Sequence, residues 1–152
     1  ALAAVRRMLA GIPPSRRKVA MPVYVESVTQ PSPQDLTDLA KIYADAPDWL
    51  LAPYSSADTL IAAALADGSL IAGRFNDRLL GAALLQRGDD AWRLSHLCVR
   101  KLTRKRGVGR RLLEETQRQA SEAGKPLRLA APAGHLEASA LAARTHLPLD
   151  PL

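Results

Sequence analysis

The stretch from Leu97 to Leu113 joins an apolar run, a basic loop that contains two glycines, and an amphipathic run. This order predicts a strand that ends near Val99 and a helix whose first turn is formed by the loop with Gly107 and Gly109. The first N–H groups of a helix have no partners within the helix, and the helix dipole adds partial positive charge there. Since glycine has no Cβ, an anion can approach its backbone closely. The segment therefore predicts an anion site, with a pyrophosphate as its ligand.

Basic side chains add positive charge at the same place: Arg104, Lys105, Arg106 and Arg110. The spacing of the glycines excludes two other phosphate loops. A dinucleotide-binding fingerprint requires a third glycine where Leu112 stands, and the G-x-x-x-x-G-K-[ST] pattern of a P-loop is absent. A nucleic-acid patch is the alternative interpretation of the basic run 100–111. That run lacks the interleaved aromatic side chains that stack on bases, so we expect no nucleic-acid partner.

The pattern Arg104-x-x-Gly107-x-Gly109 resembles the R/Q-x-x-G-x-G/A motif of the GNAT (GCN5-related N-acetyltransferase) superfamily. The resemblance implies a loop that cradles the pyrophosphate of acetyl-CoA and a preceding strand that lines the pantetheine arm. In that superfamily the end of the strand separates from its neighbour, which leaves backbone groups free to bind the arm. The cofactor-binding residues implied are Leu97 and Val99 of the strand, together with Arg104, Lys105, Arg106, Gly107, Val108, Gly109 and Arg110.

Two segments indicate a smaller group within this superfamily. The stretches Arg74–Leu80 and Leu97–Gly109 look like those of the small PanM/PanZ regulators, and the similarity is close over residues 70–116. Those regulators are GNAT-fold proteins that bind acetyl-CoA and promote maturation of the aspartate decarboxylase of pantothenate synthesis. The resemblance implies a regulatory protein partner, the decarboxylase precursor. We expect such a partner to contact the exposed hairpin Arg74–Arg78.

Acetyl transfer needs a base for the amine and an acid for the departing thiolate. His96 and His135 are the candidate bases, because the ordinary pKa of histidine lies near neutrality. A structural histidine without a catalytic role is the alternative for His96. Many GNAT enzymes carry a tyrosine acid on the last helix, and the matching position here is Ala142. The resemblance therefore supports binding of acetyl-CoA better than it supports turnover.

Two functions remain open. The first is an N-acetyltransferase that moves acetyl from acetyl-CoA to a small amine or a protein acceptor by direct attack. The second is a non-catalytic acetyl-CoA sensor of the PanM/PanZ kind that binds and regulates a protein partner. We predict no metal site. No apolar run reaches the length of a membrane span, so we expect no membrane contact.

The formal charge of +6 is unevenly distributed over the 152 residues. Residues 1–20 carry five basic residues and no acid, whereas residues 21–152 hold 16 basic residues against 15 acidic ones. We interpret 1–20 as a disordered or loosely helical extension that comes from an upstream start or an added segment, and 21–152 as a single domain. The single cysteine, Cys98, cannot form an internal disulfide, which fits a reducing, cytoplasmic setting.

The pattern along the chain predicts an α+β fold of the three-layer GNAT type, with a central, mostly antiparallel mixed sheet flanked by helices. Predicted strands cover 23–28, 70–75, 78–86, 91–99 and 127–131. Predicted helices run from Pro33 to before Pro47 and over 57–66, 108–122 and 137–145. The chain ends at Leu152, too soon for the usual final pair of strands, so a shortened C-terminal end is expected.

Local signals give finer predictions. Ser32 and Asp35 form a capping box at the start of the first helix, whose apolar face is predicted as Leu36, Leu39, Ala40 and Tyr43. The aromatic run Trp49–Tyr54 is predicted as a loop, and Asn76-Asp77 as a hairpin turn. Alternation along the strand 94–99 predicts one face with Ser95, Leu97 and Val99, and the other with His96 and Cys98.

Overall fold

The structure is a computed structural model that describes residues 23–104, 107–132 and 134–152. The expected extension 1–20 lies outside the described residues, as do Lys105 and Arg106 of the expected cofactor loop. The elements in chain order are β1 (Tyr24–Ser27), α3 (Pro33–Ala44), α4 (Asp48–Leu51), α5 (Ala57–Asp67), β2 (Leu70–Phe75), β3 (Arg78–Arg87), β4 (Trp92–Val99), the 3-10 turn η1 (Lys101–Thr103), α6 (Val108–Glu122), β5 (Leu127–Ala131), α7 (Leu136–Thr145) and β6 (Leu149–Pro151).

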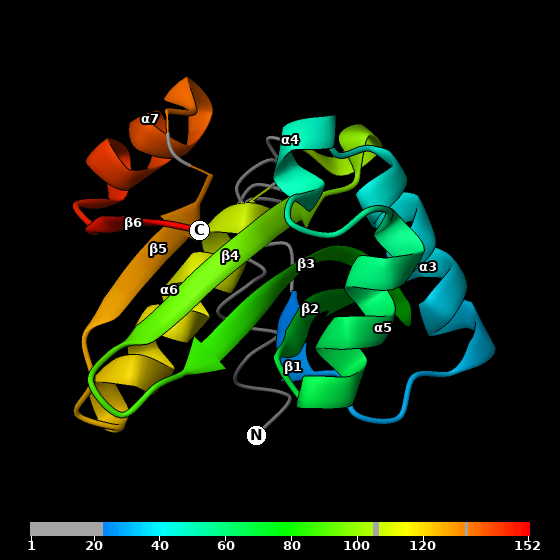
Figure 1. Ribbon diagram of the computed structural model, residues 1–152. Coiled ribbons are helices and arrows are strands. Elements are labelled where there is room, and N and C mark those ends of the chain that lie inside the picture. Colours follow the sequence, from blue (N-terminus) through cyan, green and yellow to red (C-terminus); the bar gives the residue numbers. More distant parts are fainter. Residues whose placement is uncertain (1–22, 105–106, 133) are drawn as a thin grey trace, which may run out of the picture.

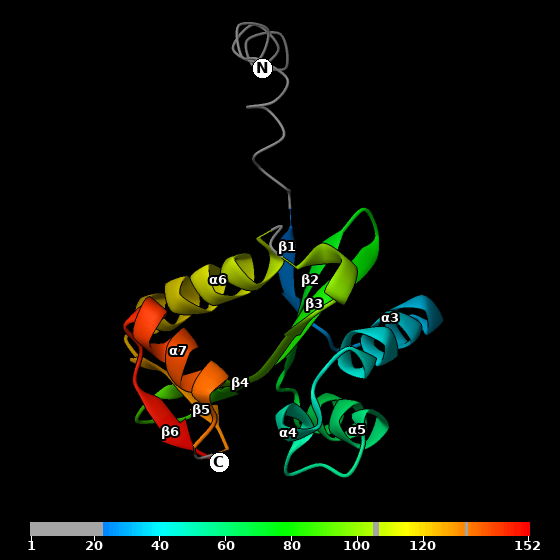
Figure 2. The same ribbon diagram turned by 90° about the horizontal axis from the view of Figure 1, so that it is seen from above.

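Six strands form one sheet in the order β1-β2-β3-β4-β5-β6. Strands β1 to β4 pair antiparallel, whereas β4, β5 and β6 pair parallel. Helices α3, α4 and α5 lie on one side of the sheet, and α6 and α7 lie on the other (Figure 1, Figure 2). The predicted α+β fold with a mixed, mostly antiparallel sheet between helices is therefore confirmed.

Each face of the sheet has its own apolar core. The first core lies under α3 and α5 and includes their buried side chains Leu39, Ile42, Tyr43 and Leu60. The second core lies under α6 and includes Val108 and Leu112. Cys98 of β4 belongs to the first core, whereas its neighbour Val99 packs against the second. Strand β4 thus contributes side chains to both cores, and its end adjoins the start of α6.

Helix α3 begins as predicted, but its buried face differs from the prediction. The Ser32 hydroxyl accepts the Asp35 N–H, and the Asp35 carboxylate accepts the Ser32 N–H, which is the predicted capping box. Leu36, which we expected in the core, is 43% exposed, and Ile42 is buried instead. The reason is that Asp35 and Asp38 face the sheet, where arginines bind them, so that Leu36 points outward.

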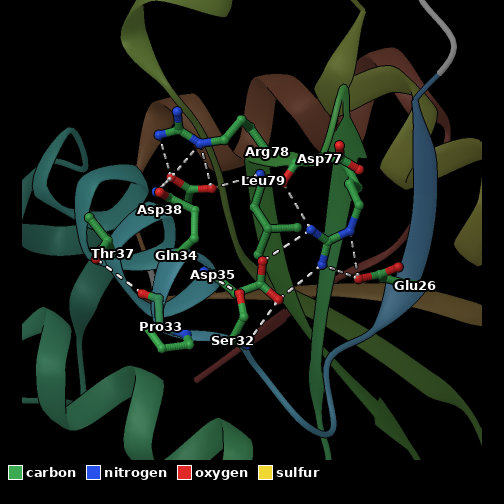
Figure 3. A network of polar contacts seen from close by, with 11 residues as sticks. Glu26, Ser32, Pro33, Gln34, Asp35, Thr37, Asp38, Asp77, Arg78 and Leu79 are labelled. Carbon is green, nitrogen blue, oxygen red and sulfur yellow. Dashed lines mark hydrogen bonds and ion pairs between the residues drawn. The ribbon is translucent and has the colours of Figure 1, made fainter.

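Two arginines of the β2–β3 hairpin bind those carboxylates (Figure 3). Arg74 pairs with Asp35 at 3.0 Å and with Glu26 at 2.7 Å, and Arg78 pairs with Asp38 at 2.7 Å. The Asp38 side chain is 1% exposed. Carboxylates of the same chain therefore bind the guanidinium groups of both arginines, while the Arg78 side chain remains 46% exposed. The network attaches the hairpin to α3.

Two connections test the turn predictions. Asn76 and Asp77 have φ values of 47° and 64°, as the predicted hairpin turn requires. The loop predicted over Trp49–Tyr54 is partly wrong, because Asp48–Leu51 form the short helix α4. Leu50 and Leu51 pack against the first core, and this tertiary contact favours a helical turn that the flanking prolines did not indicate.

A short strand, β6, runs parallel to β5 at the edge of the sheet. We expected no final pair of strands, and one strand of three residues is present. Asp150 holds it in place, since its carboxylate accepts hydrogen bonds from Arg93 at 2.9 Å and from Arg128 at 2.6 and 2.7 Å. Arg93 and Arg128 are neighbours across β4 and β5. The like charges of the two arginines would repel each other without this carboxylate between them.

We expect Asp150→Asn to lower the melting temperature near neutral pH and to have little effect in strong acid. Hydrogen bonds from Arg128 and Arg93 lower the pKa of Asp150 to about 2, below the unfolded value of about 3.9. The stabilisation is therefore present above the unfolded pKa and is lost as the pH falls through the folded pKa. Thermal melts of both proteins across this range check the prediction, with Asp89→Asn in an exposed turn as control. A difference in melting temperature that persists in acid would contradict it.

Candidate functional site

A cleft opens where β4 and β5 separate. The two strands pair from Trp92↔Leu127 to Leu94↔Leu129, and within the described residues their pairing stops there. The rest of β4, Ser95–Val99, borders a cavity of about 610 Å³. The end of α3 and α4 line one side of this cavity, and β5 and α7 line the other. Figure 1 shows β4 and β5 diverging between α4 and α7. A cavity of this size suits a small-molecule or cofactor ligand.

A β-bulge interrupts β4 inside the cleft. On β3, the single residue Ala83 lies opposite both His96 and Leu97. His96 has a φ of 55°, and the buried Tyr43 hydroxyl donates to the His96 carbonyl oxygen at 2.9 Å. The bulge breaks the predicted alternation, since Ser95 lies beside the His96 ring and not on the face of Leu97. The available signal was a break in the alternation, since two polar residues, Ser95 and His96, stand between Leu94 and Leu97.

Both ring nitrogens of His96 are engaged in the cleft wall. Nδ1 lies 2.7 Å from the Ser95 hydroxyl, and Nε2 lies 2.8 Å from the Ala52 carbonyl oxygen. Since a carbonyl only accepts, we assign the proton to Nε2, and Nδ1 then accepts from Ser95. Burial lowers the pKa of His96, and the hydrogen bond to Ala52 opposes this in part. The ring is therefore neutral, and in this arrangement neither nitrogen is free to take a proton from an amine.

We expect the protein to lose stability as the pH falls below about 6.5, the unfolded pKa of histidine, with His96 as one cause. Its folded pKa is lowered, so its contribution is present above the unfolded value and is lost as the pH falls through the folded one. Thermal melts at several pH values measure the effect. His96→Gln should flatten the pH dependence, whereas His146→Asn at the exposed C-cap of α7 should leave it unchanged. An equally steep dependence in both variants would refute the assignment.

The N-terminus of α6 lies at the end of β4. The helix begins at Val108, and its N-cap residue, Gly107, has a φ of 88°, which glycine adopts readily. Among the described residues no side chain caps this end of the helix, so its first N–H groups suit an anion. Gly109 adjoins the strand, since a Cβ built on it would lie 3.5 Å from a Val99 methyl group. Arg110 in the first turn is exposed. The predicted strand end and the predicted glycines therefore meet.

The Arg104 side chain binds backbone atoms of the protein itself. Its Nε donates to the Val99 carbonyl oxygen at 3.3 Å, and its Nη2 donates to the Asp45 carbonyl oxygen at 3.0 Å. The Asp45 carboxylate accepts the Lys101 N–H at 2.8 Å and lies 3.6 Å from Arg100 Nε. The loop that leaves β4 is therefore attached to the C-terminus of α3.

The other candidate catalytic positions, His135 and Ala142, lie at the start of α7 and within it. The His135 ring stacks on the Trp49 ring with centroids 4.5 Å apart, which joins the start of α7 to α4. Ala142, at the position expected for a tyrosine acid, is buried against the second core. The structure thus places His96 in the wall of the cavity and His135 against Trp49.

The lining residues that were not among the predicted site residues include three charged side chains and a tryptophan: Asp45, Glu137, Arg144 and Trp49. They come from the end of α3, from α4 and from α7, which are remote in sequence from the glycine loop, so no local pattern connects them with it. The rarity of tryptophan, of which the chain has two, was the one available indication for Trp49. Among the residues that the structure describes, no group of His, Cys, Asp or Glu is arranged to hold a metal ion. None of the helices in that part of the chain is long and apolar enough to cross a membrane.

The split sheet and the glycine-capped helix define the fold class, which is that of the GNAT acetyltransferases. The ribosomal-protein-S18-alanine N-acetyltransferase of Escherichia coli aligns with a TM-score of 0.62 and 22% identity over 81% of this chain and 76% of that one. The paia N-acetyltransferase of Thermoplasma acidophilum, in complex with coenzyme A, aligns with a TM-score of 0.60 and 16% identity over 82% of this chain and 89% of that one. At these identities the likeness establishes the fold.

The family is established by sequence. The chain belongs to the family described as "Acetyltransferase (GNAT) domain, PanZ", whose model matches residues 22–149. The chain is also 38% identical over 87 residues to the PanD regulatory factor of Salmonella typhimurium. That alignment spans 57% of this chain and 60% of the relative's length. The expected membership of the GNAT superfamily and the narrower likeness to the PanM/PanZ group are both confirmed.

Proposed function

We propose that the protein binds acetyl-CoA in the cleft between β4 and β5. The pantetheine arm would lie along Leu97–Val99, and the pyrophosphate would lie on the N–H groups at the start of α6, from Gly107 to Arg110. The observation that carries this proposal is the edge of β4 that faces β5, which is unpaired after Leu94 in the described part of the chain. This edge leads to the N-terminus of α6, where the described residues provide no side-chain cap. The amides of the arm need the hydrogen-bonding groups that such a strand edge offers, and an anion suits the helix N-terminus. Bound acetyl-CoA would supply an activated acetyl thioester.

The function that this site supports best is acetyl-CoA-dependent regulation of a protein partner. Turnover would need a base and an acid beside the thioester. The His96 ring nitrogens are both engaged, and Ala142 stands where a tyrosine acid would be expected. The chain has the features that would bind the ligand, while His96 is engaged in the cleft wall and the tyrosine acid is absent.

The family likeness supports a protein partner. The relative in Salmonella typhimurium is named a PanD regulatory factor, and we infer a partner of the same kind here, the decarboxylase precursor. A partner that approaches the β2–β3 hairpin would meet the exposed tip, Asn76 and Asp77, and the outer side of Arg78. Arg74 is committed to carboxylates and is 25% exposed, so we expect its role to be structural.

Two measurements on the same preparation separate a regulator from an enzyme. Capture of the purified decarboxylase precursor is measured with and without acetyl-CoA, and thiol release from acetyl-CoA is measured with a panel of amines. We expect acetyl-CoA to increase capture and thiol release to stay at the level of the protein-free control. Rapid thiol release with an amine, together with capture that ignores acetyl-CoA, would overturn the regulator proposal.

Acetyl transfer to an amine is the second candidate, and one observation favours it. Glu137 on α7 is exposed, and its side chain lines the cleft, where a carboxylate can act as a base. If the amine panel does give thiol release, Glu137→Gln should reduce the rate about 100-fold, within the usual contribution of a general base. Glu122→Gln, an exposed change on α6, should leave that rate unchanged. Equal rates in the two variants would remove Glu137 as the base.

A further inference from the structure

This inference rests on the proposed acetyl-CoA site and concerns the first residue of its motif. We propose that Arg104 is a positioning residue that fixes the cleft wall for the pantetheine arm, and that it does not bind the pyrophosphate. Its guanidinium bridges two carbonyl oxygens, those of Val99 at the end of β4 and of Asp45 at the end of α3. Hydrogen bonds from a charged donor are stronger than neutral ones, and the planar fork of arginine can reach both acceptors at once.

The position of Arg104 relative to the sheet supports this role. Cys98 and α3 belong to the core on one face of the sheet, whereas Val108 at the start of α6 belongs to the core on the other face. Burial raises the pKa of the Cys98 thiol, and the charge of Arg104 close to that thiol opposes the increase. The hydrogen bond from Arg104 to the Asp45 carbonyl oxygen likewise places its guanidinium on the α3 side of β4, whereas α6 packs on the opposite face of the sheet.

The C-terminus of α3 is a suitable place for this cation. Asp45 is the C-cap residue of α3, so its carbonyl lies at the negative end of the helix dipole. The Asp45 carboxylate also accepts a hydrogen bond from the Lys101 N–H at 2.8 Å. Asp45 and Val99 both line the cavity, on the α3 side and on β4 respectively. A bridge between them sets the position of the Val99 carbonyl, which is one of the groups that the pantetheine arm would use.

The test compares two ligands and two arginines. Acetyl-CoA has both the pyrophosphate and the arm, whereas 3′-phosphorylated ADP keeps the pyrophosphate without the arm. We expect Arg104→Gln to weaken acetyl-CoA binding about tenfold, the range for hydrogen bonds from a charged group, and to leave binding of 3′-phosphorylated ADP unchanged. Arg110→Gln is the matched control, because it removes the same charge from the first turn of α6. Arg110→Gln should weaken the binding of both ligands to the same extent and reduce the salt dependence of binding.

Arg104→Lys completes the set, since lysine keeps the charge but cannot bridge two carbonyls with a planar fork. It should behave like Arg104→Gln if Arg104 positions the wall. Thermal melts of each variant establish that it is folded before affinities are compared. The inference would be overturned if Arg104→Gln weakened the binding of 3′-phosphorylated ADP as much as the binding of acetyl-CoA. It would also be overturned if Arg104→Gln reduced the salt dependence of binding as Arg110→Gln does. Wild-type protein that binds neither ligand would instead overturn the proposed site itself.

Discussion

Gly107→Asp is expected to abolish measurable acetyl-CoA binding, with a loss of at least about 100-fold, or about 2.7 kcal/mol. Gly107 is the N-cap of α6 and has a φ of 88°. Apart from its chain neighbours and the backbone of its own helix, a Cβ there would meet no heavy atom of the described residues within 4 Å, so these residues leave room for the new side chain. Its carboxylate would place negative charge where the pyrophosphate is proposed to lie, at the positive end of the helix dipole. Isothermal titration calorimetry with acetyl-CoA measures the effect.

Gly107→Asn is the matched control for charge. Asparagine has nearly the same shape as aspartate, and both tolerate a positive φ better than most residues do. We expect the asparagine variant to keep most of its affinity, because it adds no charge. Equal affinities in the aspartate and asparagine variants would show that the anion does not bind at this helix N-terminus, and undiminished affinity in both would remove the loop from the site.

Asp38→Ala is expected to reduce the free energy of unfolding by about 3 kcal/mol, near the lower end for a buried ion pair that loses one partner. The Asp38 carboxylate binds Arg78 and also accepts the buried Leu79 N–H at 3.1 Å. We expect the lower end of this range of free energies because Arg78 is 46% exposed, so that water can solvate its guanidinium once the carboxylate is removed. Urea denaturation measures the loss, with Asp58→Ala in the exposed first turn of α5 as control. A loss no larger than that of the control would show that the network contributes little.

The same carboxylate gives a dependence on pH. Burial raises the pKa of Asp38, but hydrogen bonds from Arg78 and the Leu79 N–H outweigh this, so that its pKa is lowered. The contribution of Asp38 is therefore present above the unfolded pKa of about 3.9 and is lost as the pH falls through the folded value. The difference in stability between wild type and Asp38→Ala should shrink in acid. A difference that stays constant would contradict the ionised state assigned to Asp38.

The parts of the fold that short-range chemistry determines could be predicted. Helix α6 has its predicted bounds, Val108–Glu122, and the hairpin turn lies at Asn76-Asp77. The predictions were wrong where contacts between residues distant in the sequence determine the structure. Leu36 is exposed because Asp35 turns toward an arginine on another element, and α4 forms because its leucines reach the first core. Neither contact is visible in the local pattern of apolar residues.

The candidate site likewise has a part that the local sequence predicts and a part that depends on tertiary contacts. Gly107, Gly109 and Val99 lie within one continuous segment, so their spacing predicted that they meet. The role of Arg104 could not be predicted, because its acceptor at Asp45 belongs to a helix 59 residues away in the chain. The bulge at His96 adds a residue to β4 and places Ser95 on the other face than predicted, and its signal in the sequence was the pair of consecutive polar residues Ser95 and His96. Local motifs thus predicted where the proposed anion site lies, while the cleft walls depend on tertiary contacts.

Binding of acetyl-CoA can be measured by calorimetric titration of the purified wild-type protein, after a native mass spectrum has shown that no CoA species remains bound. We expect saturable binding of one acetyl-CoA per chain, with an affinity that falls as ionic strength rises because a positive site would hold the pyrophosphate. Absence of saturable binding in protein free of CoA, at low ionic strength and with the fold verified by circular dichroism, would contradict it.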